Sequence, residues 1–360
     1  FSSSFSQNAY LPDIALILNM STVSRDVKNS DYSDFTIPGF VDADDNGDST
    51  GNLPFNKSEG FNLNYAELGI HSVIDPYFEA YAHFHLHTDE FEIGEAYVVT
   101  RSLPASLRVK TGKFKSSFGR INEKHQHSWN FDEQPIIYKS LFGPDSISDA
   151  GIQLQWVMPT DIYAMAGIEA LQGTNGRSFG DDNGNLFVGY LKSSLDITDD
   201  FSVLAGASLA HGQTDEQKPS NVYGVDLTLR EQLGSYSSLV WQSEYLKRNK
   251  DVIDGTETVT DKQAGLYTQV VYQYNNNYSF GLMYDLITEN DTDLSDYDGI
   301  DTDNLQRYTA MLEYKPFPFS RLRLEYSFDQ TKIIDDKRQD VNTVMLTFNL
   351  AAGAHGAHSY

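Results

Sequence analysis

The feature that most constrains the fold of this 360-residue chain is a two-residue alternation of apolar and polar side chains, which recurs from end to end. Such alternation is typical of β-strands with one face in an apolar environment and the other in a polar one. It predicts about sixteen strands, with these approximate bounds: 12–26, 60–74, 77–88, 90–102, 105–116, 148–158, 161–172, 184–197, 200–213, 220–232, 235–249, 262–275, 277–289, 304–315, 319–331 and 339–352. This number lies within the range of bacterial outer-membrane barrels.

The connections between these strands alternate in length. Every second connection is very short and built from turn residues: Asp75-Pro76, Leu103-Pro104, Pro159-Thr160, Asp199-Asp200, Leu233-Gly234, 275–277 and 316–318. The others are generally longer and acidic, namely 27–59, 117–147, 173–183, 250–261 and 290–303, with 88–90 as the short exception. A soluble sandwich has no reason to keep this order. We therefore predict an all-β, transmembrane antiparallel barrel with short periplasmic turns and long extracellular loops.

The two faces of the predicted strands differ in polarity. In strand 77–88, one face carries Phe78, Ala80, Ala82, Phe84 and Leu86, and the other carries Glu79, Tyr81, His83, His85 and His87. The apolar face would meet lipid and the polar face a wet lumen. Aromatic residues gather near the short turns, as an interfacial girdle requires. Strand 60–74 fits this pattern only with a shift of phase midway, for which a β-bulge would be needed.

Composition excludes several other classes of protein. The chain has no cysteine, which excludes a disulfide scaffold and a thiolate metal site. Its net charge of −25 argues against nucleic acid as a partner. It begins with Phe1 rather than Met, as expected of a mature product whose signal has been removed. We expect one domain, 1–360, in a bacterial outer membrane, surrounded by the lipid bilayer and lipopolysaccharide.

The longest stretch that does not alternate runs from Lys113 to Gly151 and carries several aromatic residues that need a surface to pack on. We predict that this third outer loop folds into the pore and constricts it. Its charged residues would face cations of the wall and set a field across the pore; the residues concerned are Arg120, Glu123, Lys124, Asp132 and Glu133 in the loop and Arg108, Lys110, Arg230 and Arg323 on the wall. The alternative is a loop that packs on the outer rim.

Histidines suggest a metal site in the same region. His83, His85 and His87 share one face of one strand, and His125 and His127 lie in the loop. Alternate positions of a strand are about 6.5–7 Å apart, so two imidazoles can converge on one ion such as Zn, Cu or Ni. Three histidines in a row would need a bend, or a helper such as Glu90, Glu92 or a loop histidine. The alternative is a polar lumen lining without metal.

A second candidate site lies in the outer loops. Asp42, Asp44, Asn46 and Asp48 match the start of a calcium loop, although Leu53 stands where the closing Glu belongs. A solvated acidic surface is the alternative. No nucleophile elbow, HExxH motif or phosphate loop is present. We therefore expect no enzyme.

Several stretches resemble a family of Gram-negative proteins labelled zinc-regulated, TonB-dependent outer-membrane receptors. The stretches are EGFNLNYAEL (59–68), FEIGEAYVVTRSLP (91–104), GKFKSSFGRINEKHQHSWNF (112–131), AGIQLQWVMPT (150–160) and GIEALQG (167–173). The resemblance covers roughly the first half of the chain and implies an outer-membrane barrel expressed under zinc limitation. TonB-dependent receptors have a plug domain and roughly 22 strands, for which this chain is too short. We expect a barrel without a plug domain.

These patterns together predict a porin for the passive diffusion of small hydrophilic solutes or ions. It would need no cofactor, lean towards cations because of its negative charge, and form a homotrimer as general porins commonly do. A first alternative is a divalent-metal (zinc) uptake or binding channel that uses the lumen histidines. A second is a surface adhesion or structural barrel.

Overall fold

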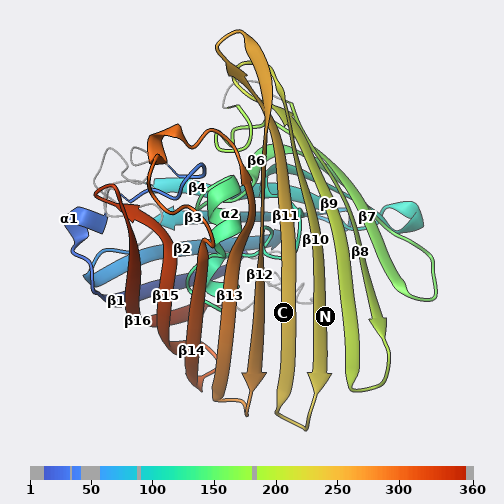
Figure 1. Ribbon diagram of the computed structural model, residues 1–360. Coiled ribbons are helices and arrows are strands. Elements are labelled where there is room, and N and C mark those ends of the chain that lie inside the picture. The colour runs from blue at the N-terminus through green and yellow to red at the C-terminus, as the bar shows by residue number, and fades with distance from the viewer. Residues whose placement is uncertain (1–11, 33–34, 42–56, 87–90, 181–184, 354–360) are drawn as a thin grey trace, which may run out of the picture.

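The computed structural model describes residues 12–32, 35–41, 57–86, 91–180 and 185–353. These residues form a closed antiparallel barrel of sixteen strands in which each strand pairs with its neighbours in sequence (Figure 1). The first strand pairs with the last, from Ala15 opposite Gly353 to Arg25 opposite Thr343, and this pairing closes the barrel. No helix in the described part of the chain is long and apolar enough to cross a membrane.

The first half of the barrel consists of β1 (Asp13–Arg25), β2 (Gly60–Val73), β3 (Phe78–Leu86), β4 (Phe91–Thr100), β5 (Leu107–Lys115), β6 (Ser148–Val157), β7 (Tyr163–Leu171) and β8 (Leu186–Asp196). The second half consists of β9 (Phe201–Gln213), β10 (Pro219–Gln232), β11 (Ser238–Asp254), β12 (Glu257–Gln273), β13 (Tyr278–Asp291), β14 (Gln306–Phe317), β15 (Ser320–Ile334) and β16 (Lys337–Gly353). Within the described ranges, two short α-helices lie in outer connections, α1 (Asn29–Tyr32) and α2 (Ile136–Phe142). The all-β class and the strand number predicted from alternation are confirmed.

One predicted loop is wrong. Segment 250–261 is not a loop, because β11 and β12 continue to a two-residue turn and form a hairpin that rises above the rim (Figure 1). Val252 pairs with Val259, and the Thr260 hydroxyl donates a hydrogen bond of 2.6 Å to Asp251. β-Branched residues favour the strand here, and Gly255 (φ 60°) provides the positive φ that the turn needs.

The shift of phase expected in strand 60–74 lies at Asn64. Asn19 pairs with Tyr65 and Met20 with Leu63, so that Asn64 is an extra residue on β2. Leu63, before this bulge, is exposed on the outer face, whereas Tyr65, after it, is buried. The bulge therefore reverses the inward face of β2 and directs the odd-numbered residues after it into the lumen.

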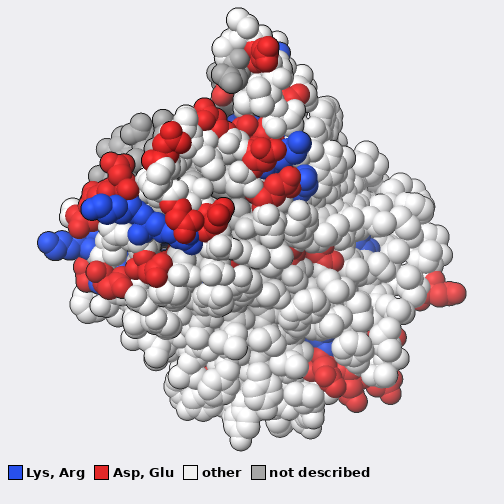
Figure 2. Space-filling model, viewed as in Figure 1, with Lys and Arg blue, Asp and Glu red and all other residues white. Residues whose placement is uncertain are grey.

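The outer surface of the barrel is apolar. Large exposed side chains such as Leu154, Ile168, Val225 and Leu282 cover the strands, and Figure 2 shows a mostly uncharged belt between the rims. Exposed aromatic residues stand near the short turns, as predicted: Tyr77, Trp156, Tyr163, Tyr236, Tyr274, Tyr278, Phe317 and Phe319. An apolar belt with aromatic borders is the surface of a protein in a bacterial outer membrane, and that location is confirmed.

Candidate functional site

The loop 116–147 lies inside the barrel, with α2 in the interior of the ring of strands (Figure 1). It enters after β5 and leaves to β6. Pro135 precedes the helix, and Gly143 (φ 76°) ends it with a backbone conformation that other residues rarely adopt. Near the start of the loop, Gly119 (φ 61°) passes so close to the wall that an added Cβ would lie 2.5 Å from Oε2 of Glu244. The chain can follow this path because Gly119 has no side chain.

Buried apolar residues hold the start of the loop and the helix α2 against the wall. Phe118, Tyr138 and Leu141 are fully buried, and the rings of Phe118 and Phe142 meet edge to face at 5.4 Å. They pack against lumen-facing apolar residues of the wall: Leu186, Val188, Ala210, Val222, Leu246 and Ile287. The loop and the wall thus share one buried apolar cluster, which holds the loop in place.

Ion pairs of both signs join the loop to the wall. Arg120 Nη2 lies 2.6 Å from Asp226, Glu123 lies 3.1 Å from Lys192, and Asp132 lies 3.2 Å from Arg323. Glu133 lies between Arg307 (3.4 Å) and Lys139 (3.0 Å). Of the wall cations predicted to face the loop, the structure thus brings Arg323 to an acid of the loop.

The other predicted wall cations have different neighbours. Arg108 is the second residue of β5, near the short-turn end, where it pairs with Glu79 at 3.0 Å. Lys110 lies over the rings of Tyr97 and Phe114, at 5.1 and 5.0 Å. Arg230 is exposed near the end of β10. Lys124, which was predicted as a cation of the loop, accepts a hydrogen bond of 3.0 Å from the Trp129 indole through its backbone carbonyl. Arg108 and Arg230 are too near the short turns to reach the loop.

Wall carboxylates also hold the backbone of the loop. Four of them, each on a different strand, accept backbone N–H groups at 2.8–2.9 Å: Glu169 from Ser117, Glu244 from Arg120, Asp285 from Ile136 and Glu325 from Asp132. These acids and Lys192, Asp226 and Arg307 were not singled out from the sequence. The sequence signal available for these residues was a charged side chain at a lumen-facing position of a strand. The pattern of a strand does not show which loop residue such a side chain contacts.

Burial and charge shift the pKa values of the loop residues. Burial alone would lower the pKa of His125, but the carboxylates of Glu67 and Glu95 outweigh it and raise that pKa to about 9. Burial lowers the pKa of Lys139 to about 8, although Glu133 opposes it. Burial would raise the pKa of Glu133, but Lys139 and Arg307 hold it well below its usual range. These residues therefore carry their charges in the docked loop near neutral pH.

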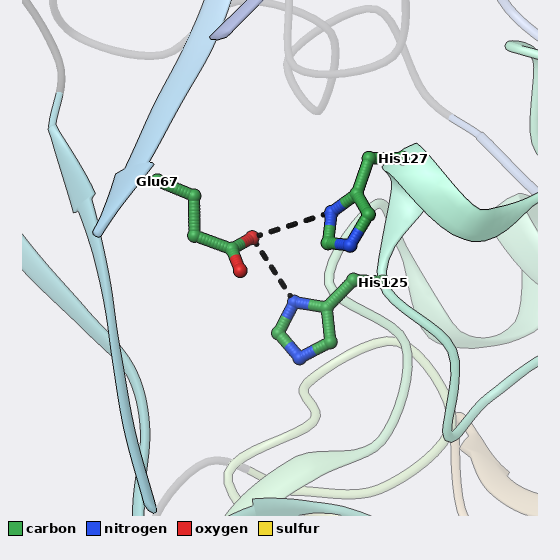
Figure 3. Close-up of side chains that lie close together, drawn as sticks. All are labelled: Glu67, His125 and His127. Atoms are coloured by element: carbon green, nitrogen blue, oxygen red, sulfur yellow. Dashed lines mark hydrogen bonds and ion pairs between the residues drawn. The ribbon is translucent and has the colours of Figure 1, made fainter. Parts of the chain in front are cut away.

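Two histidines of the loop contact one carboxylate of the wall, Glu67 of β2 (Figure 3). Two histidines of β3 lie close to the same carboxylate. Oε2 of Glu67 lies 3.2 Å from Nδ1 of His125 and 3.7 Å from Nδ1 of His127. Oε1 lies 3.0 Å from Nδ1 of His83. His85 Nε2 is 3.6 Å from the same carboxylate, and Glu95 of β4 lies 2.6 Å from Nε2 of His125.

This cluster contains four of the five histidines predicted as metal ligands, and His87 lies outside the described residues. Among the described residues, two groups have metal-binding atoms within 4.8 Å of one another, and both are here: Glu67, His125 and His127, and His83, Glu95 and His125. Glu67 and Glu95 were missed from the sequence, because a bulge at Asn64 on β2 and another at Gly94 on β4 conceal which face each of them occupies. The predicted calcium ligands Asp42, Asp44, Asn46 and Asp48 lie outside the described residues.

Comparison with known proteins places this barrel among its relatives. No family model matches the chain. An uncharacterized protein of Aquifex aeolicus is 38% identical over 388 aligned residues, which cover 99% of this chain and 82% of that protein.

Solved structures with the same fold include the outer-membrane channel DcaP of Acinetobacter baumannii (12% identity, TM-score 0.62, 96% of this chain and 99% of that one). They also include an anion-selective porin from Comamonas acidovorans (11%, 0.60, 95% and 99%) and the trimer form of OmpT from Vibrio cholerae (11%, 0.57, 96% and 100%). These likenesses establish the porin-type barrel fold. They give no support to the family of zinc-regulated, TonB-dependent receptors that the sequence resembles.

Proposed function

We propose, since this chain belongs to the protein family of its Aquifex aeolicus relative and has the fold of outer-membrane porins, that it is an outer-membrane porin. Small hydrophilic solutes or ions would diffuse through it passively, without a cofactor or an energy input. A sixteen-strand barrel is wide enough for an aqueous channel. The loop 116–147 then decides how much of that width stays open and which charges line it.

One observation carries this proposal, namely that a loop held by ion pairs of both signs crosses the lumen of a porin-sized barrel. Rings of fixed charge at a narrow section are the usual means of selecting ions. A cavity of about 320 Å³ between the loop and strands β4–β6 supports a path for solutes beside the loop. Its lining includes Lys113, Lys115 and Arg177 as well as Glu92 and Asp145.

The test is single-channel recording from purified protein in planar lipid bilayers. We expect discrete conductance steps, and larger steps from a variant in which residues 120–145 are replaced by a short Gly-Ser linker. The mobility of the unheated barrel in SDS gels checks that each preparation is folded. Folded protein that gives no steps would reject the porin and favour the adhesion or structural barrel.

We further propose a preference for cations, on the basis of the net charge of −25. Negative charge near the mouth raises the local concentration of cations. The reversal potential in a KCl gradient measures this preference directly. A value of zero, or one with the sign of anion preference, would remove the cation preference and leave the porin proposal intact.

A second candidate function is the uptake of a divalent metal such as zinc. The observation that favours it is the cluster of His83, His85, His125 and His127 around Glu67 in the lumen. We expect micromolar Zn²⁺ to block the current or shift its reversal potential in the wild type, but not in a His83→Ala, His85→Ala variant. An identical response of both proteins, or none in either, would reject metal uptake.

A trimeric assembly is proposed by analogy with the trimer form of the Vibrio cholerae protein. The apolar belt would then meet both lipid and neighbouring protomers, with lipopolysaccharide around the assembly. Light scattering of the detergent complex, corrected for bound detergent, gives the protein mass. A mass of one chain, about 40.5 kDa, would reject the trimer.

A further inference from the structure

The cluster around Glu67 joins three separate parts of the chain at one buried point. His83 comes from β3, Glu95 from β4 and His125 from the loop, and each contributes a metal-binding atom within 4.8 Å of the other two. Their exposures are 1%, 5% and 2%. A ligand shared by these residues would connect the loop directly to the wall.

Glu67 orients two of the three residues. Its two oxygens lie 3.0 Å from Nδ1 of His83 and 3.2 Å from Nδ1 of His125, so it engages the same ring nitrogen of both histidines. Nε2 is then the ring nitrogen that Glu67 does not engage, and Nε2 of His125 lies 2.6 Å from Glu95. Histidines that bind a metal commonly donate their other N–H to a carboxylate, which fixes the tautomer and the orientation of the ring. Glu67 provides this support for two rings at once.

The charges of the cluster also suit a divalent cation. Glu67 and Glu95 are two buried carboxylates, and among the described residues neither forms an ion pair with a lysine or an arginine. Buried charges need compensation. One divalent ion would balance the two carboxylates.

We propose that a divalent transition-metal ion binds to His83, Glu95 and His125, and that it clamps the lumen loop to β3 and β4. Two imidazole nitrogens and one carboxylate oxygen suit Zn²⁺ or a similar ion, whereas Ca²⁺ and Mg²⁺ prefer oxygen ligands. A water molecule would complete a tetrahedral set. In this proposal the ion stays bound to the protein, in contrast to the transported ion of the second candidate function. Binding of the ion does not require the protein to be a channel, and only an effect of the ion on conductance would depend on the proposed channel function.

The second group, Glu67, His125 and His127, shares His125 with the first. The two groups are therefore alternative ligand sets for one ion. The first group has all three members buried, and in it Glu67 remains free to orient the rings. His127 is less buried than the other members. Substituting His83 and His127 separately therefore distinguishes the two ligand sets.

The experiment measures binding without reference to transport. The full chain, folded in detergent and treated with a chelator, is titrated with Co²⁺ and then with Zn²⁺. We expect one site per chain, with the visible absorption bands of tetrahedral Co²⁺, which Zn²⁺ displaces. His83→Ala and Glu95→Gln should each abolish these bands. Glu67→Gln should keep the stoichiometry and weaken affinity by about 10–100-fold.

His211→Ala is the matched control, because His211 is an exposed histidine whose Nδ1 lies 2.8 Å from Asn221. It should bind like the wild type. No tetrahedral bands in the folded wild type, or the same bands in His83→Ala and Glu95→Gln, would overturn the site. Loss of the bands in His127→Ala but not in His83→Ala would overturn this ligand set and support the other.

The clamp is tested on the same proteins by protease protection. Bound Zn²⁺ should slow cleavage by trypsin at Lys124 at least tenfold in the wild type, with no change in Glu95→Gln. Equal cleavage with and without bound Zn²⁺ would overturn the clamp. These results do not depend on conductance, so a protein that binds metal but passes no current would refute the porin proposal alone.

Discussion

Removing the ring of Phe118 should release the loop from the lumen. Phe118 is fully buried at the start of the loop, against Phe142 and against the backbone of Gly224 on β10. A Cβ at Gly224 would lie 3.0 Å from Cζ of Phe118, so the ring fills the space that this glycine leaves. Phe118→Ala leaves a cavity at that point, and the rigid strands cannot close around it.

The magnitude follows from the buried volume. Truncating a buried phenylalanine to alanine costs about 3–5 kcal/mol. The barrel does not depend on this residue for its strand pairing, so the cost falls on loop docking. At about 1.4 kcal/mol per factor of ten, a loss of about 3 kcal/mol raises the ratio of undocked to docked loop by about 10².

Two measurements check this prediction. Single-channel recordings of Phe118→Ala should show a larger or noisier conductance, and trypsin should cleave the loop at Lys124 about 10² times faster under conditions of rapid exchange. Phe280→Ala is the matched control, because Phe280 has the same side chain on the lipid-facing surface, where it is 47% exposed. Wild-type conductance and wild-type cleavage in folded Phe118→Ala would refute the view that this packing holds the loop.

Three further predictions concern the anchors of the loop. Gly119→Ala should undock the loop as Phe118→Ala does, because the new Cβ would lie 2.5 Å from Oε2 of Glu244 at a φ of 61°; faster cleavage at Lys124 checks it, and wild-type protection would contradict it. Arg323→Met leaves Asp132 buried without its guanidinium partner, whereas Glu313 keeps Arg321, so it should cost about 3–5 kcal/mol; unfolding in denaturant and detergent measures the loss, and an unchanged midpoint would argue against a structural role. The lowered pKa of Glu133 means that its stabilising effect is complete above its usual pKa of about 4.5 and is lost as pH falls below that value. Protection of the loop from cleavage by pepsin, an acid protease, should therefore decrease between about pH 4.5 and 2, and less steeply in Glu133→Gln; equal slopes in both proteins would contradict the assignment.

The prediction of the barrel from sequence succeeded because its signals are local. A strand in the wall must alternate with a period of two, since lipid covers one face and the lumen the other. Short turns and long connections are read directly along the chain, as at Asp75-Pro76 and Leu233-Gly234. One local signal misled: polar, acidic residues at 250–261 resemble a loop, but strand pairing continues through them.

The site depended on contacts that no local pattern encodes. Asp132 and Glu325 are 193 positions apart, and Arg120 and Asp226 are 106 apart. Lys192 and Arg307 contact acids of the loop, whereas Arg108 and Arg230 do not. The difference follows from the position of each side chain along the barrel axis and from the path of the loop. Both depend on strand register and on the packing of Phe118 and α2.

Local patterns along the chain specify a barrel of about sixteen strands, its lipid-facing surface and one long central segment with aromatic residues to bury. The meeting of this segment's histidines with those of β3 around Glu67 and Glu95 depends on the folded barrel, because it requires the bulge at Asn64. One extra residue reverses the inward face of β2, and the alternation that predicts a strand cannot say where its phase changes.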